Sequence, residues 1–350
     1  MADWANLPRD RWSDIESGVS FNVAELGRIA RALAVDPGTL LRGEEGSPRR
    51  SVARFRQAAD PLKKPESAEI RALALAAELG RIGGALHRLL SKPLPLVDVR
   101  QPISINSYEE SWKQGYRLGE KARNLLGISA GPIVDLQKLF ETLGIHITTL
   151  EIGRETIDAA SMVEAGAVPI ILLNKASGHV MSPLPRRATM AHELCHILHD
   201  AGDHDLATQL SGDHVDDFVE QRARAFAPAF LAPPSQVRQW FDEGEGRRQK
   251  NPHDKVLELA TRWGMSWSAA VWHAKNCRLI LTKTARRLLE LGVEQDWHLA
   301  FEHAIPQSQS ILADVDVHPL CRGRMAKLVL EAFEVGVISE GRAREILTWG

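Results

Sequence analysis

Apolar residues recur every three to four positions along most of the chain, as in helices, and three short apolar stretches interrupt this pattern. The stretches have the length and composition of strands in a small sheet. A helix is expected after them, because Pro185 favours a first turn and Gly202 favours an end. The expected strands cover 145–150, 159–164 and 168–173, and the expected helices before them cover 67–90, 108–126 and 133–143.

The three expected strands differ in their suitability for the edge of a sheet. Residues 168–173 are uniformly apolar, as in a strand that is covered on both faces. An edge strand of a sheet can pair with an extended peptide. We therefore expect 159–164 to be the edge strand that receives a substrate.

The two ends of the chain are expected to be helical. Residues 12–18 and 23–41 resemble the second half of an XRE-type helix-turn-helix domain whose first two helices are missing. Because the reading helix needs its partner helix to hold it in the major groove, we expect this remnant to pack or dimerise rather than read DNA. Beyond Pro234 the pattern predicts helices only, over 255–264, 268–281, 295–304, 321–336 and 339–347.

Composition is that of an ordinary globular protein, with 44% hydrophobic and 25% charged residues among 350. No apolar run approaches the roughly 18 residues needed to span a bilayer, and the N-terminus lacks a signal-peptide pattern, so we expect a cytoplasmic protein without membrane contact. Three cysteines without a metal-binding spacing indicate free thiols. The net charge of -2 gives no overall attraction to nucleic acid, although basic clusters at 42–64 and 247–250 leave DNA contact open.

The strongest chemical signal is the motif His192-Glu193-Leu194-Cys195-His196 on the helix expected after the sheet. Two histidines four residues apart lie one helical turn from each other, so both imidazoles can bind one zinc ion. Glu193 lies beside that face, where it can accept a proton from water instead of binding the metal. The alternative is a surface helix that carries two histidines by chance.

A catalytic zinc ion needs a third protein ligand and an open coordination position. The metzincin pattern requires glycine at 199 and histidine at 202, whereas the chain has His199 and Gly202, which excludes that class. A carboxylate from a following helix is the other solution. Glu220 lies on a stripe of small residues that would let its helix approach the histidines closely.

Other acidic and histidine side chains near this helix remain open as ligands. Asp216 and Asp217 lie one turn before Glu220 and compete with it for the role of third ligand. A stretch rich in glycine and aspartate carries His204, Asp205 and His214, and its composition predicts a solvated loop.

The zinc helix, the acid helix and their flanks resemble the ImmA/IrrE family of zincin-like metallopeptidases. The resemblance runs from about Tyr108 to Arg278 and implies that His192, His196 and Glu220 bind Zn2+ with Glu193 as the general base. The matching residues are 168–174, 187–196, Glu220, Ala223, Phe226, Ala227, Leu231 and Pro233.

Two residues depart from the family pattern. Cys195 stands where glycine is usual between the ligands. Pro228 lies inside the acid helix, where it removes one backbone hydrogen bond and should bend the helix, with a possible effect on the direction of Glu220.

The resemblance implies a fold and a partner. The expected fold is α+β, a zincin-like core flanked by helical regions, and the expected substrate is a helix-turn-helix repressor whose cleavage derepresses a stress, mobile-element or antiphage defence operon. The CapP branch, which is paired with a repressor in antiphage operons, is one branch compatible with the sequence. The alternative function is a DNA-binding regulator with a structural or vestigial metal site. The expected domains are 1–43 (helix-turn-helix remnant), 44–100 (linker and helix), 101–240 (zincin-like domain) and 241–350 (helical accessory domain).

Five further residues have roles that the sequence leaves open. His199 continues the face of the zinc helix and is either a group that contacts ligands or substrate, or a plain hydrogen-bonded histidine. Cys277 or Cys321 can hold the zinc in a latent state, although buried inert cysteine is commoner. Tyr108 and Tyr116 lie on one helix, where packing is the expected role rather than oxyanion stabilisation.

Overall fold

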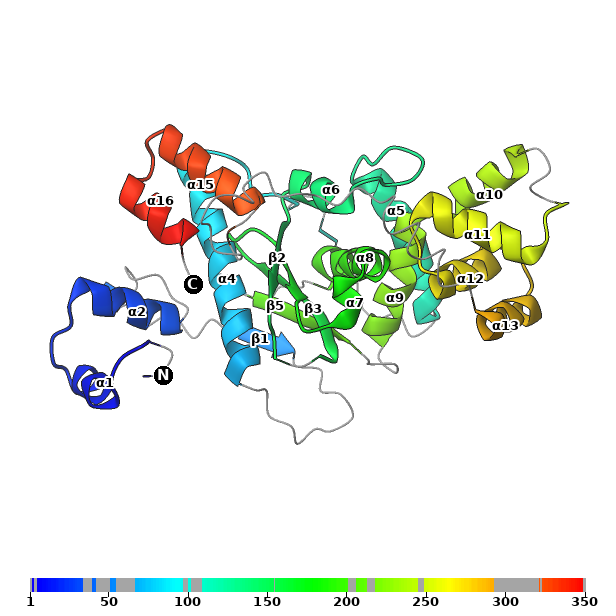
Figure 1. Cartoon of the computed structure of the whole chain (residues 1–350). Coiled ribbons are helices and arrows are strands. Elements are labelled where there is room, and N and C mark those ends of the chain that lie inside the picture. The colour runs from blue at the N-terminus through cyan, green and yellow to red at the C-terminus, as the bar shows by residue number, and fades with distance from the viewer. Residues whose placement is uncertain are drawn as a thin grey trace.

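A mixed five-stranded sheet lies in the middle of the fold, with helices on both of its faces (Figure 1). The structure is a computed structural model. It describes residues 2, 5–33, 40–41, 51–54, 67–96, 100–101, 109–153, 155–200, 206–212, 218–244, 249–292, 321 and 323–348. The α+β class expected from the sequence is confirmed.

The sheet contains the three expected strands and two that the sequence did not indicate. The strand order is β1-β5-β3-β4-β2, with the outer pairs β1–β5 and β4–β2 parallel and the inner pairs antiparallel. The strands are β1 (Ser51–Arg54), β2 (His146–Leu150), β3 (Ile157–Glu164), β4 (Ile170–Asn174) and β5 (Leu206–Gly212).

The expectation that 159–164 form the edge of the sheet is wrong. Ala160 of β3 is aligned with Leu172 of β4 on one side and with Leu210 of β5 on the other. The reason is that the glycine- and aspartate-rich stretch, whose composition predicts a loop, contains β5. In the described part of the chain the edges are β1 and β2, and β4 is interior, as its apolar composition predicted.

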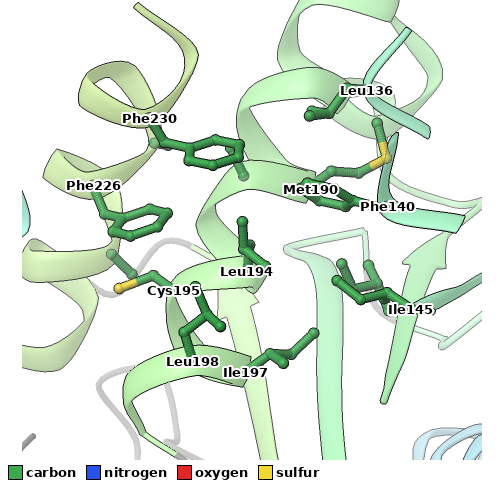
Figure 2. Close-up of a cluster of buried hydrophobic side chains, with 14 of the residues drawn as sticks. Leu136, Phe140, Ile145, Met190, Leu194, Cys195, Ile197, Leu198, Phe226 and Phe230 are labelled. Atoms are coloured by element: carbon green, nitrogen blue, oxygen red, sulfur yellow. The ribbon is translucent and has the colours of Figure 1, made fainter. Parts of the chain in front are cut away.

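Alternating side chains of the inner strands enter two separate cores, which gives the molecule three layers. Ile170 and Leu172 of β4 pack with helix α4 (Ser67–Leu89), whereas Ile171 and Leu173 pack on the opposite face with helix α8 (Pro183–His199). This is the period-two geometry of a strand that is buried on both faces. Figure 2 shows the second core, in which side chains of α8 meet Phe226 and Phe230.

Helix α5 (Ser111–Leu125) packs very closely on helix α9 (Phe218–Leu231) because two glycines lie at the contact. A Cβ atom at Gly115 would overlap the carbonyl oxygen of Arg222, and one at Gly119 would lie 2.5 Å from that of Phe226. The spacing of four residues puts both glycines on one face of α5. The backbone of α9 is therefore held directly against α5. Short helices α6 (Leu136–Thr142) and α7 (Gly178–Met181) complete this side.

The helices after α9 fall into two groups at opposite ends of the view in Figure 1. Helices α10 (Pro234–Glu243), α11 (Pro252–Trp263), α12 (Trp267–Asn276) and α13 (Thr282–Leu291) share a core of their own. Helices α15 (Arg324–Glu334) and α16 (Glu340–Leu347) instead join the core formed by α4 and the sheet. The expected domain boundaries stay a prediction, and the helix expected over 295–304 lies outside the described residues.

The N-terminal helices α1 (Arg9–Glu16) and α2 (Val23–Leu33) form a small cluster joined by an ion pair between Arg11 and Glu25, 2.8 Å apart. Both lie where the helix-turn-helix remnant was expected, and its relation to such domains stays a prediction. Among the helices that the structure describes, none has the length and apolarity needed to cross a membrane.

Candidate metal site

Helix α8 presents two faces with different chemistry. Met190, Leu194 and Ile197 point into the core shared with the sheet (Figure 2). His192 and His196 take part in neither core cluster, and their rings meet edge to face with centroids 4.8 Å apart. Proline in the first turn starts the helix at Pro183, two residues earlier than expected, and after Pro185 no glycine or proline occurs before the histidines.

Three side chains from α8 and α9 converge on one point. The Nε2 atoms of His192 and His196 are 3.0 Å apart, and the carboxylate oxygens of Glu220 lie 3.2 Å and 3.4 Å from them. Ligand atoms at about 2.0–2.1 Å from a tetrahedral zinc ion are separated by roughly 3.3 Å. The separations therefore fit the donor set of one metal ion, and these three residues form the one such group among the residues described.

Glu193 supplies a second indication that a polar group belongs at this point. Its side chain is fully buried, and neither carboxylate oxygen has a hydrogen-bond partner among the described residues. A buried carboxylate without a donor is costly unless water or an ion completes it. The residues present thus fit a site that holds a metal ion and water.

The two histidines also control the charge of Glu220. Burial acts to raise the pKa of this carboxyl group, but hydrogen bonds and electrostatic attraction from His192 and His196 outweigh it and lower the pKa well below the ordinary value. Glu220 therefore stays a carboxylate, which is the form that binds a metal. The competing candidates Asp216 and Asp217 lie outside the described residues.

Asp200 and Arg222 were not identified from the sequence. Asp200 follows α8 directly, and its Oδ2 lies 2.7 Å from Nδ1 of His196. Its Oδ1 pairs with Arg222 of α9, and Arg222 donates a second hydrogen bond to Gln114 of α5 at 3.1 Å. The spacing of four residues between His196 and Asp200 was a usable signal. Nothing in the sequence indicated the partners on α5 and α9.

His199, the third histidine on this face, lies outside the converging group. It is buried, and its Nδ1 is 3.1 Å from the backbone oxygen of Gln101. Burial lowers the pKa of His199 to about 4, so its ring is neutral at pH 7. Its edge packs on Phe226.

The residues considered for latency and oxyanion stabilisation have partners elsewhere. The thiol of Cys277 lies 3.5 Å from His273, and that of Cys321 donates to the backbone oxygen of Ile346. Burial raises the pKa of both thiols to about 12, and neither thiol belongs to the group that converges on His192 and His196. Tyr116 hydrogen-bonds to His273, and Tyr108 lies outside the described residues.

The two departures from the family pattern are accommodated. Cys195 is fully buried beside Phe226 (Figure 2), and burial raises the pKa of its thiol to about 12, so it acts as an apolar core residue. Pro228 lies within α9 two turns after Glu220. Glu220 still reaches both histidines, so the proline does not turn it away from them.

A small sheet with a histidine-bearing helix and an acid-bearing helix on one face defines the zincin-like class. Residues 140–273 match the family model of the IrrE N-terminal-like domain, peptidase family M78. This confirms the resemblance to the ImmA/IrrE family over that segment, which contains α8, α9 and all the residues that converge. No curated protein matches the chain.

Proposed function

We propose that the chain is a zinc-dependent endopeptidase that cleaves a helix-turn-helix repressor and thereby derepresses a stress, mobile-element or antiphage defence operon. The convergence of His192, His196 and Glu220 beside the unpartnered carboxylate of Glu193 supports the zinc peptidase. The match to a peptidase family over 140–273 supports the reaction class. The repressor as substrate rests on the family resemblance.

The proposed reaction assigns each proton transfer to Glu193. A zinc ion held by the three ligands would polarise the scissile carbonyl and make water acidic enough to lose a proton near pH 7. Glu193 accepts that proton while the water oxygen bonds to the carbonyl carbon. Glu193 then gives the proton to the amide nitrogen as the C–N bond breaks, which leaves a carboxylic acid and an amine. Burial keeps the carboxylate of Glu193 away from bulk solvent.

Cleavage of the repressor tests the proposal. The purified chain is mixed with zinc and the helix-turn-helix protein encoded beside its gene, and the products are separated by mass. Wild type should cleave, whereas Glu193→Gln should be slower by about 10²- to 10⁴-fold while retaining the metal. Sequence-specific binding to duplex DNA, without cleavage by either form, would instead support a regulator with a structural metal site.

A further inference from the structure

The carboxylate of Asp200 is shared between the two helices that carry the candidate ligands. One oxygen lies 2.7 Å from Nδ1 of His196 on α8, and the other pairs with Arg222, two residues after Glu220 on α9. A carboxylate only accepts hydrogen bonds, so the proton of the His196 ring must be on Nδ1. In the neutral ring, which is the form that binds a metal, Nε2 of His196 then keeps a free lone pair toward His192 and Glu220.

Arg222 decides how the carboxylate of Asp200 can turn. Its side chain is fully buried, and it donates to Asp200 and to Gln114 of α5. A guanidinium group has donors only, so the atom of residue 200 that faces it must be an acceptor. Arg222, which is itself held by Gln114 of α5, therefore requires an acceptor atom of residue 200 to face it.

We infer that Asp200 is a positioning residue that selects the metal-binding tautomer of His196, and that Arg222 orients Asp200 for this role. The inference rests on the proposed zinc site, and it extends that site to two residues outside the ligand set. Partners of this kind orient metal-binding histidines, and losing one typically weakens metal affinity 10- to 100-fold. The alternative is that the Asp200–Arg222 pair only ties α8 to α9.

The substitution Asp200→Asn separates these two roles. Because Arg222 can only donate, the amide oxygen of the asparagine should turn toward Arg222 and its NH2 group toward His196. That NH2 group donates to Nδ1 and forces the ring proton onto Nε2, the atom that would bind the metal. In Asp200→Asn, α8 and α9 remain joined by hydrogen bonds, but His196 is in the tautomer that cannot bind the metal through Nε2. A second change, Arg222→Gln, removes the obligate donor and lets the amide turn back.

The experiment measures zinc affinity by chelator competition and the His196 tautomer by 15N NMR of the metal-free protein labelled at histidine. At a pH where the His196 ring is neutral, wild type should show its proton on Nδ1. Asp200→Asn should show it on Nε2 with affinity reduced 10- to 100-fold, and Asp200→Asn/Arg222→Gln should recover most of that affinity. Glu164→Gln is the matched control, because Glu164 is also buried and its partner Arg81 lies on α4, away from α8 and α9. The zinc affinity of this variant should equal that of wild type.

The outcomes distinguish this inference from the proposed function. Absence of zinc binding by wild type would overturn the metal site itself. Zinc binding by wild type with the same affinity in Asp200→Asn, or a loss that Arg222→Gln does not reverse, would overturn the positioning role alone. If Asp200→Asn does not fold, the wild-type spectrum decides, since a neutral His196 ring with its single proton on Nε2 in the metal-free protein contradicts the inference.

Discussion

Two buried glutamates, Glu164 and Glu193, differ in whether their carboxylates have hydrogen-bond partners among the described residues. Glu164 is held by Arg81, whose Nε lies 2.8 Å from one of its oxygens. Glu193 is more deeply buried and has no hydrogen-bond partner among the described residues. A buried group without a partner lowers stability, and such groups persist where function needs them. The difference marks Glu193 as a group kept for chemistry.

Replacing each glutamate by glutamine should therefore change stability in opposite directions. In metal-free protein, Glu193→Gln should raise the free energy of unfolding by about 1–3 kcal/mol, because it removes an uncompensated buried charge. Glu164→Gln should lower it, because Arg81 loses its charged partner. Urea denaturation of the three proteins measures both changes. A loss of stability in Glu193→Gln would show that its carboxylate has a stabilising partner.

Helix α5 is the element that positions α9. Gly115 and Gly119 allow the backbone of α5 to touch α9. The side-chain oxygen of Gln114 accepts a hydrogen bond from Arg222, and the Ser111 hydroxyl donates one to Gln221 at 2.6 Å. The contacts of Ser111, Gln114 and Gly115 lie on the turns of α9 that carry Glu220 and Arg222. The third ligand is therefore placed by a helix that contributes no ligand itself.

A methyl group at Gly115 should consequently reduce metal binding. Gly115→Ala would push its Cβ into the carbonyl oxygen of Arg222, and because that atom is backbone, α9 must move. We expect a loss of about 1–3 kcal/mol in the free energy of unfolding together with weaker zinc affinity. Gly27→Ala is the control, since that position is helical and has open space, and alanine there should stabilise by up to about 1 kcal/mol. Equal effects of the two substitutions would contradict the close α5–α9 contact.

At the scale of the molecule, α5 also connects the layered part to the cluster of helices α10–α13. Tyr116 of α5 donates to Nδ1 of His273 at 2.9 Å, and Nε2 of His273 donates to the backbone oxygen of Ala232 at 2.7 Å. Asn276 donates to Tyr116 in turn, at 2.8 Å. Both ring nitrogens of His273 are thus used in its neutral form. Protonation would place a second donor opposite the Tyr116 hydroxyl.

The free energy of unfolding should therefore fall in mild acid, because His273 is neutral in the folded protein and protonated in the unfolded chain. Burial lowers the pKa of His273 to about 4. The hydrogen bond to the backbone oxygen of Ala232 and the charge of Glu120 oppose this shift, and Arg238 adds to it. The unfolded chain has a pKa near 6.5, so below that pH it binds the proton first and stability is lost as pH falls toward 4. Between pH 7 and pH 5 the loss should be roughly 2 kcal/mol.

Urea denaturation at the two pH values, on wild type and His273→Gln, measures this contribution. The variant should lose about 2 kcal/mol less than wild type between pH 7 and pH 5. His199, whose pKa burial also lowers to about 4, stays in both proteins, so the difference isolates His273. The same pH dependence in both proteins would show that His273 does not stay neutral in the folded state.

Local patterns allowed much of this protein to be predicted. The apolar stretches that became β2, β3 and β4, and the helices α4, α5, α6, α8 and α9 around them, have periodicities that depend on neighbours within a few residues. The histidines of α8 are brought together by one helical turn alone. The position of Glu220 was open to competition from neighbouring aspartates, and the structure puts it against both histidines.

Contacts between distant segments decided the rest. The pairing of β5 with β3 moved the sheet edge to β1, more than a hundred residues earlier in the chain, and no local signal specifies such a partner. The link from Gln114 through Arg222 and Asp200 to His196 joins three elements by side chains whose types are ordinary on any helix surface. Sequence alone determined which residues can bind a metal, because helical spacing is local. Only the tertiary structure decided what holds them in place, because burial and partners arise when separate elements pack.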